Sequence, residues 1–281
     1  MTTAIEFHQP LVTTPFVDVG ESEASRLRLL NITAGTLHLV SGVAMLILAT
    51  DFTLPVTAFG LEGPPGTPVS EGVLRSVMDV PLAPLAASFA FLSSIFHFLV
   101  SSPGVFDTYR RELSLGRNRF RWVEYSLSST LMILLIMLIS GISDSAALIG
   151  VAFANISMIL FGWIMEMVNT SGPAAANGGD GTVWWTPFWF GCIAGAGPWV
   201  AFVAYLAINI SLSDQGPPGF VYGILVTIFV LFNCFAVNQW LQYRGRGRWT
   251  DYLFGEKVYI VLSFVAKTLL VWQVYANVLV G

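Results

Sequence analysis

Residues 258–280 read VYIVLSFVAKTLLVWQVYANVLV, an apolar run whose single charged residue, Lys267, lies about ten residues from either end. A run of this length can cross the roughly 30 Å of hydrocarbon in a bilayer as a helix. A lysine ammonium at mid-bilayer costs about 2.5–3.5 kcal/mol on insertion scales, so it indicates a functional site. Ten residues of helix span about 15 Å, so the Lys267 head group cannot reach water. We therefore expect Lys267 either to pair with a buried acid or, as we favour, to bind a carbonyl ligand as a Schiff base.

The whole chain has the composition of a multi-span membrane protein. It has 281 residues, of which 55% are hydrophobic and 11% charged, and its mean hydropathy is +0.71. A soluble domain of this size cannot bury so much apolar surface, whereas several membrane spans can. Hydropathy predicts an all-α bundle of seven membrane helices, at residues 29–50, 81–102, 120–142, 146–168, 184–210, 220–241 and 258–280.

The segments outside these spans differ in character. Residues 1–25 are polar and acidic, and we predict a loosely packed lead-in that is not a cleaved signal peptide, ahead of a seven-helix domain at 26–281. Residues 51–80 predict a loop with β structure, because β-prone stretches alternate there with Pro and Gly. Residues 169–182 read as a flexible linker and residues 211–219 as a tight turn.

Basic residues predict the orientation of the chain. Thirteen residues are Lys or Arg. Apart from Lys267, eleven of them precede the first span or lie between spans 2 and 3 or 6 and 7, and only Arg75 lies on the other side. The positive-inside rule then predicts a cytoplasmic N-terminus and an extracellular C-terminus. The net charge of −4 does not indicate a nucleic-acid-binding protein. Cys192 and Cys234 lie in apolar runs, and no His or Cys pair has metal-ligand spacing, so we expect neither a disulfide nor a metal site.

Two carboxylates within the spans are candidate partners for Lys267. Glu166 is near the cytoplasmic end of its span, where we expect it to face the lipid headgroups. Glu124 lies in the first turns of the third span, one turn after Arg121, so an ion pair between these two is an alternative. We favour Glu124 as the counterion of Lys267, because an unpaired buried charge is untenable.

Other polar residues lie on the same helix faces. Ser263 is one turn before Lys267, Ser128 is one turn after Glu124, and Ser93 and His97 are four residues apart in the second span. His38 is in the middle of the first span. Each could be a structural polar residue bound to a neighbouring helix. Two membrane histidines nevertheless favour proton storage or relay, because imidazole titrates near neutral pH.

Aromatic residues could line an apolar ligand cavity. We select Trp163 and Phe202 as candidates, whereas Trp184 and Trp185 begin a span and read as interfacial anchors.

These features together resemble a known family. Seven spans, a lysine in the last and an acid three residues after an arginine in the third resemble the microbial rhodopsins. The predicted cytoplasmic N-terminus, residues 121–126 (RWVEYS), residues 263–267 (SFVAK) and the two membrane histidines make the chain similar to the heliorhodopsins over residues 26–281.

The resemblance implies a retinal photoreceptor and not an enzyme. It implies all-trans retinal on Lys267, Glu124 as sole carboxylate counterion and Ser263 beside the Schiff base. It also implies that Ser93, His97 and His38 form a network that receives the Schiff-base proton without net export. Homodimers, a β-structured extracellular loop at residues 51–80 and a cytoplasmic effector that is not identified belong to the same expectation.

Two other classes of function stay open. Outward proton pumps that resemble this chain carry a second carboxylate eleven residues after the counterion and an aspartate one turn before the retinal lysine. Leu135 and Ser263 stand at those positions here, which speaks against a pump. A light-gated channel would need a polar path, and the third span offers none past Thr130. In a seven-helix receptor or transporter for a non-covalent ligand, Lys267 and Glu124 would form only a salt bridge.

Overall fold

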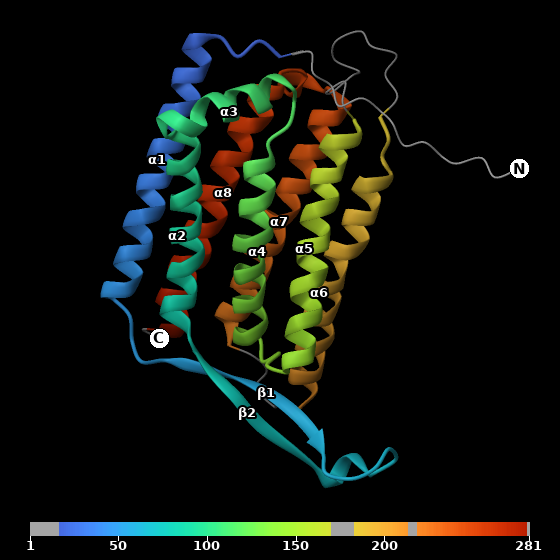
Figure 1. Ribbon diagram of the computed structural model, residues 1–281. Coiled ribbons are helices and arrows are strands. Elements are labelled where there is room, and N and C mark those ends of the chain that lie inside the picture. The colour runs from blue at the N-terminus through green and yellow to red at the C-terminus, as the bar shows by residue number, and fades with distance from the viewer. Residues whose placement is uncertain (1–16, 170–182, 213–217, 280–281) are drawn as a thin grey trace, which may run out of the picture.

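The protein is described by a computed structural model, which covers residues 17–169, 183–212 and 218–279. Seven of its helices are long and apolar enough to cross a membrane, as hydropathy predicted. They are α1 (Glu21–Ile47), α2 (Leu82–Ser101), α4 (Arg119–Ile139), α5 (Ser145–Val168), α6 (Thr186–Leu212), α7 (Gly219–Arg244) and α8 (Tyr252–Val274), which continues as a π-helical turn at Tyr275–Leu279. The helices stand side by side in one bundle (Figure 1).

Two helix starts differ from the hydropathy reading. Helix α1 begins at Glu21, inside the segment predicted to be a loose lead-in, and Val19 and Ala24 are buried. The Val17 amide also donates to the Ser114 carbonyl at 3.2 Å, so residues 17–25 are packed. Helix α8 begins at Tyr252, six residues before the predicted span at 258. Most of the predicted linker (170–182) and part of the predicted turn (213–217) lie outside the described residues.

The loop between α1 and α2 is a β-hairpin, in agreement with the prediction. Strands β1 (Thr53–Leu61) and β2 (Gly72–Pro81) pair antiparallel, with a bulge between Val56 and Thr57. The hairpin projects from the end of the bundle opposite α3 (Figure 1). It is tied to the bundle where the Thr57 amide donates to the Ser143 carbonyl at 2.8 Å.

A short helix, α3 (Pro103–Ser114), was not predicted. It crosses one end of the bundle between α2 and α4 (Figure 1). Tyr109, Glu112 and Leu113 are buried on its inner side. A hydropathy scan misses this helix because its inner face alone is apolar.

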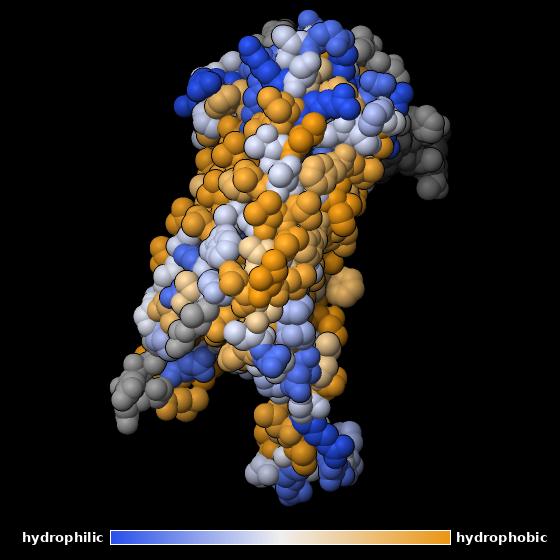
Figure 2. Space-filling model, turned by 90° about the vertical axis from the view of Figure 1, so that its left-hand side faces the viewer, coloured by the Kyte–Doolittle hydropathy of each residue, from blue (hydrophilic) through white to orange (hydrophobic). Residues whose placement is uncertain are grey.

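The packing is that of a bundle in lipid. The core lies among α2, α4 and α8, where Leu82, Leu135 and Leu270 are fully buried. Large apolar side chains such as Phe153, Ile193 and Val226 are exposed on the outer helices. On the face shown in Figure 2, apolar side chains cover the middle of the bundle and polar side chains gather at its two ends. This distribution fits a membrane protein, because lipid tails are as apolar as the side chains on the outer faces of the helices and can contact them directly.

Candidate functional site

Lys267 and Glu124 meet in the middle of the bundle. Lys267 Nζ donates to Glu124 Oε1 at 2.7 Å and to Ser263 Oγ at 2.7 Å. The exposed fractions of Lys267 and Glu124 are 3% and 6%, so bulk water does not screen this pair. Helix α8 supplies Lys267 and Ser263 from successive turns of one face, and α4 supplies Glu124.

A second group of polar side chains surrounds Glu124. Ser93 Oγ donates to Glu124 Oε1 at 2.6 Å. His97, one turn further along α2, has its Nδ1 atom 2.7 Å from Asn31 Oδ1. The His38 ring stacks on the His97 ring, with centroids 5.7 Å apart. His38 Nε2 is buried and has no hydrogen-bond partner among the described residues. The residues selected from the sequence in α1, α2, α4 and α8 therefore lie together around Lys267.

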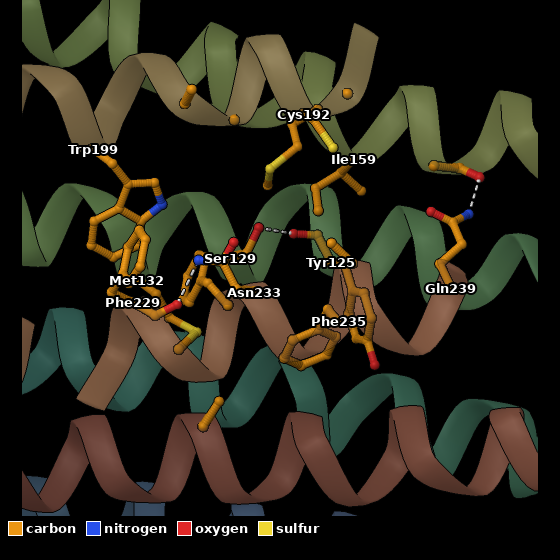
Figure 3. Close-up of a pocket in the computed structure, with 18 of the residues that line it drawn as sticks. Tyr125, Ser129, Met132, Ile159, Cys192, Trp199, Phe229, Asn233, Phe235 and Gln239 are labelled. Atoms are coloured by element: carbon orange, nitrogen blue, oxygen red, sulfur yellow. Dashed lines mark hydrogen bonds between the residues drawn. The ribbon is translucent and has the colours of Figure 1, made fainter. Parts of the chain in front are cut away.

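A cavity of about 710 Å³ opens beside Lys267. Its wall is mainly apolar and aromatic and includes Trp199, Phe229 and Phe235 (Figure 3). Ser128 also lines it, and its buried hydroxyl has no hydrogen-bond partner among the described residues. A cavity of this size is within the range of about 300–1,000 Å³ that is typical of small-ligand sites.

The two aromatic candidates chosen from the sequence are not among the residues that line this cavity. Trp163 does not line the cavity, and Phe202 is buried in the main core cluster. Trp199, less than one helical turn before Phe202, lines the cavity instead. The sequence could not distinguish these positions, because α6 is apolar on all sides and gives no sign of which side faces inward.

The cavity fits retinal by size and by chemistry. Its apolar wall suits a polyene, and the Lys267 amine at its edge suits the aldehyde. The wall includes no carboxylate among the residues that the structure describes, so the charge in this region is concentrated at Lys267 and Glu124.

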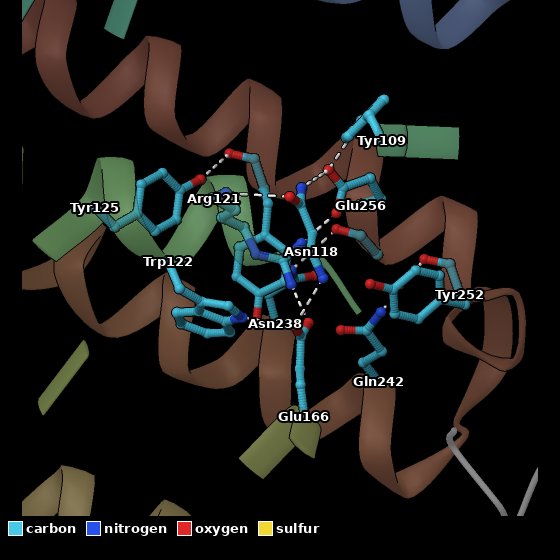
Figure 4. Close-up of polar contacts among 12 residues, drawn as sticks. Tyr109, Asn118, Arg121, Trp122, Tyr125, Glu166, Asn238, Gln242, Tyr252 and Glu256 are labelled. Atoms are coloured by element: carbon cyan, nitrogen blue, oxygen red, sulfur yellow. Dashed lines mark hydrogen bonds and ion pairs between the residues drawn. The ribbon is translucent and has the colours of Figure 1, made fainter. Parts of the chain in front are cut away.

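A buried ion cluster lies where α4 and α8 begin and α5 ends (Figure 4). The Arg121 guanidinium binds Glu166 of α5 through one terminal nitrogen and Glu256 of α8 through the other. The backbone amide of Asn118 and the indole of Trp122 also donate to Glu166, at 2.9 and 2.6 Å. We call Arg121, Glu166 and Glu256 the arginine cluster.

The arginine cluster corrects one expectation and removes one alternative. Glu166 is buried and does not face the headgroups, since its side chain is only 2% exposed. Arg121 does not pair with Glu124, because its guanidinium is held by the two other acids. Arg121, which was counted with the basic residues between spans 2 and 3, is therefore inside the bundle.

Glu256 was missed because it lies two residues before the predicted start of the last span. Asp251 gives the missing signal, since its carboxylate accepts from the Leu253 amide at 2.9 Å and caps α8. An aspartate is a preferred N-cap residue, so a start at residue 252 could have been read from the sequence.

Tyr109 connects α3 to the arginine cluster. Its hydroxyl donates to Glu256 Oε1 at 3.1 Å, and Asn118 Nδ2 donates to the same oxygen at 2.8 Å. Burial, together with the neighbouring Glu256 carboxylate, raises the pKa of Tyr109 well above its usual range. The phenol therefore keeps its proton.

Comparisons with known proteins agree with this geometry. A sequence model of the family described as heliorhodopsin matches residues 27–279. Among solved structures, a light-driven proton pump from Leptosphaeria maculans is 16% identical with a TM-score of 0.55, over 93% of this chain and 97% of that one. The Exiguobacterium sibiricum rhodopsin is 13% identical with a TM-score of 0.57, over 92% and 97% of the two chains.

A third structure, a thermophilic rhodopsin, is 11% identical with a TM-score of 0.58, over 94% of this chain and 98% of that one. At these identities the likeness shows a shared fold and carries no residue roles. A comparison with curated protein sequences gave no match.

Proposed function

This chain belongs to the heliorhodopsin family, and we propose that it senses light through retinal on Lys267, with an internal proton transfer and no net ion transport. The family and the seven-helix bundle identify a retinal photoreceptor of the membrane, a kind of protein that is generally not an enzyme.

One observation carries the linkage: Lys267 Nζ lies at the edge of the 710 Å³ apolar cavity, 2.7 Å from a buried carboxylate. We infer that Lys267 would hold all-trans retinal as a Schiff base and that Trp199, Phe229 and Phe235 would form part of the apolar wall around it. Bound retinal supplies light absorption and a photoisomerisation. The chain supplies a dry, shaped wall, and Glu124 holds the proton on Lys267 Nζ as its counterion.

The proton path follows from the polar neighbours of Glu124. Ser263 and Ser93 bind the two partners of the ion pair and fix their geometry. A proton released from Lys267 Nζ would find imidazole acceptors at His97 and His38, and Ser128 adds a free hydroxyl at the cavity wall. We propose that the proton stays within this network and returns to Lys267 by the same route.

The rest of the proposal concerns topology and partners. The arginine-rich end of the bundle, which includes α3, would be cytoplasmic, and the hairpin would be extracellular. Residues 1–25 would be a cytoplasmic segment ahead of the retinal-binding domain. Exposed apolar side chains on the hairpin, such as Phe59 and Leu74, support a homodimer contact there. A cytoplasmic effector would meet the arginine-rich end.

Absorption spectroscopy tests the linkage. The protein expressed with all-trans retinal should show a visible band that hydroxylamine bleaches under illumination. Lys267→Ala should lack this band, while Lys257→Ala, a matched change ten residues earlier in α8, should keep it. A coloured Lys267→Ala protein, or a wild type that stays colourless with retinal, would favour a receptor for a non-covalent ligand.

A further inference from the structure

A chain of buried side chains leads from His97 to helix α3. His97 Nδ1 is 2.7 Å from Asn31 Oδ1, Asn31 Nδ2 is 3.4 Å from the Tyr109 hydroxyl, and Tyr109 donates to Glu256 at 3.1 Å. Three helices, α1, α2 and α3, supply the first three members, and α8 supplies the last. We propose that Asn31 and Tyr109 are positioning residues that couple the protonation of His97 to the arginine cluster and to α3. This inference rests on the proposed function.

Asn31 determines which nitrogen of His97 can take a proton. Asn31 Nδ2 donates to the Leu27 carbonyl at 2.9 Å, which turns Oδ1 toward His97. An amide oxygen only accepts, so His97 Nδ1 must carry the hydrogen of this bond. Neutral His97 therefore has its lone pair on Nε2, and that atom is the one that can receive a proton from Lys267.

The space around the chain can hold water. A cavity of about 40 Å³ is bordered by the polar side chains of His97, Asn31, Glu124, Tyr109 and Glu256, among other residues. A polar cavity of this size has room for a water molecule that bridges such groups. The Lys267 site and the arginine cluster therefore border one polar space and are joined by the Asn31–Tyr109 chain.

A proton on His97 changes the first bond of the chain. The bond from His97 Nδ1 to Asn31 Oδ1 then has a cationic donor, and such bonds are shorter and roughly twice as strong as neutral ones. A shift of Asn31 toward His97 lengthens its contact with Tyr109, which at 3.4 Å is already the longest in the chain. Tyr109 keeps its own proton, so the effect on Glu256 is a change in hydroxyl orientation and not a second proton transfer.

Helix α3 is the element that this change reaches. Tyr109 is buried, and its hydroxyl ties the middle of α3 to Glu256 of α8. A weaker Asn31–Tyr109 contact changes how α3 packs on the bundle. Helix α3 lies at the arginine-rich end, where an effector would bind. Because α3 is outside the membrane spans, its displacement can be measured from solution.

Hydrogen–deuterium exchange of residues 103–114, in the dark and under illumination, tests the coupling. Wild type should show a light-dependent difference in exchange. Tyr109→Phe and Asn31→Leu should reduce this difference at least severalfold while the visible band is retained. Tyr275→Phe is the control, because it removes a half-buried tyrosine hydroxyl at the end of the bundle opposite α3, and it should behave as wild type.

The outcomes separate the two proposals. A wild type without a visible band would contradict the proposed function. A pigmented wild type in which the hydrogen–deuterium exchange of α3 does not change on illumination would contradict the coupling alone. A pigmented Tyr109→Phe protein with the full light-dependent difference also overturns the coupling. If Asn31→Leu does not fold, the Tyr109→Phe result decides.

A retinal-free measurement tests the contact itself. In the apoprotein, Asn31→Leu and Tyr109→Phe should each lower the thermal midpoint by about 2–4 °C, the effect of roughly 1 kcal/mol in a chain of this size. The double variant should fall by less than the sum, since either change removes the shared hydrogen bond. Full additivity would mean that the two side chains are not coupled, and the proposal would fail.

Discussion

At the scale of single residues, the Lys267–Glu124 pair is stabilised in the bundle by two neighbouring serine hydroxyls. Glu124 Oε1 accepts from both Lys267 and Ser93, and Lys267 Nζ donates also to Ser263. Burial strengthens the attraction between the two charges but makes either charge costly alone. Removal of one charge should therefore change the protonation of the other.

We predict that Glu124→Gln shifts the spectroscopic titration of the pigment. Without the carboxylate, the protonated form on Lys267 Nζ loses its counter-charge, so the visible band should give way to an ultraviolet band at a lower pH than in wild type. Absorption spectra across a pH series measure this. Glu112→Gln, at a buried acid of α3 away from the site, should titrate as wild type. An unshifted Glu124→Gln titration would mean that another anion is the counterion.

At the scale of elements, the arginine cluster joins three helices that are distant in the sequence. Arg121 of α4 holds Glu166 of α5 and Glu256 of α8 at once. Loss of Arg121 would leave the Glu166 and Glu256 carboxyl groups without their shared partner in a buried space. The breaking of a buried pair by removal of one partner costs about 3–5 kcal/mol.

We predict that Arg121→Met destabilises the bundle far more than Arg119→Met. Arg119 is two residues earlier on α4, is 47% exposed and lies 3.6 Å from Glu112. The Arg119 guanidinium is solvent-exposed, and Glu112 keeps Arg117 as a partner at 3.2 Å, so we expect the loss of Arg119 to cost only about 0–1 kcal/mol. Thermal unfolding of both variants in detergent compares them, with the retinal-free protein used so that pigment does not contribute. Equal midpoints would contradict a structural role for the cluster.

The sequence predicted the elements whose signal is local. Each membrane helix is a long apolar run, so hydropathy located all seven to within a few residues at most ends. Helix α3 was missed because its burial depends on docking against α2 and the start of α8, which no local pattern records. Glu256 was missed because the predicted span began after it, although the N-cap Asp251 marks the true start, and its pairing with Arg121, 135 residues away, has no local signal. Lys267 and Glu124 could be selected because a lone charge in an apolar run stands out by itself.

At the scale of the whole molecule, the basic residues lie at one end of the bundle. The loops between α2 and α4 and between α7 and α8 lie at the end that carries α3, and Arg75 is on the hairpin at the other end (Figure 1). Arg121 is buried in the cluster, and the remaining loop residues still give a strong asymmetry. Cytoplasmic loops collect such charges, so this end should be inside the cell.

We predict that the N-terminus is protected in intact cells and that the C-terminus is accessible. Epitope tags at the two ends, probed with protease or antibody before and after permeabilisation, measure this directly. The test is independent of retinal, so the Lys267→Ala protein should give the same result. Digestion of the N-terminal tag on intact cells would reverse the orientation, and with it the assignment of α3 to the effector side.

The last prediction is that illumination causes no sustained proton or ion movement across the membrane. Leu135, which is fully buried in the core, stands on α4 where an outward pump would carry a second carboxylate. Ser263 accepts from Lys267 where such a pump would carry an acid. The cavity wall adds no carboxylate among the described residues, so we expect a proton that leaves Lys267 Nζ to stay with Glu124 and the histidines beyond it.

Light-induced pH changes in cell suspensions, with and without a protonophore, measure this. The wild type should match the Lys267→Ala control, apart from a transient that returns in the dark. A return by the same route moves no net charge, because the proton is stored on the same side from which it is recovered. A sustained shift that the protonophore abolishes would show that a second path exists beyond Leu135, and the protein would then be a pump.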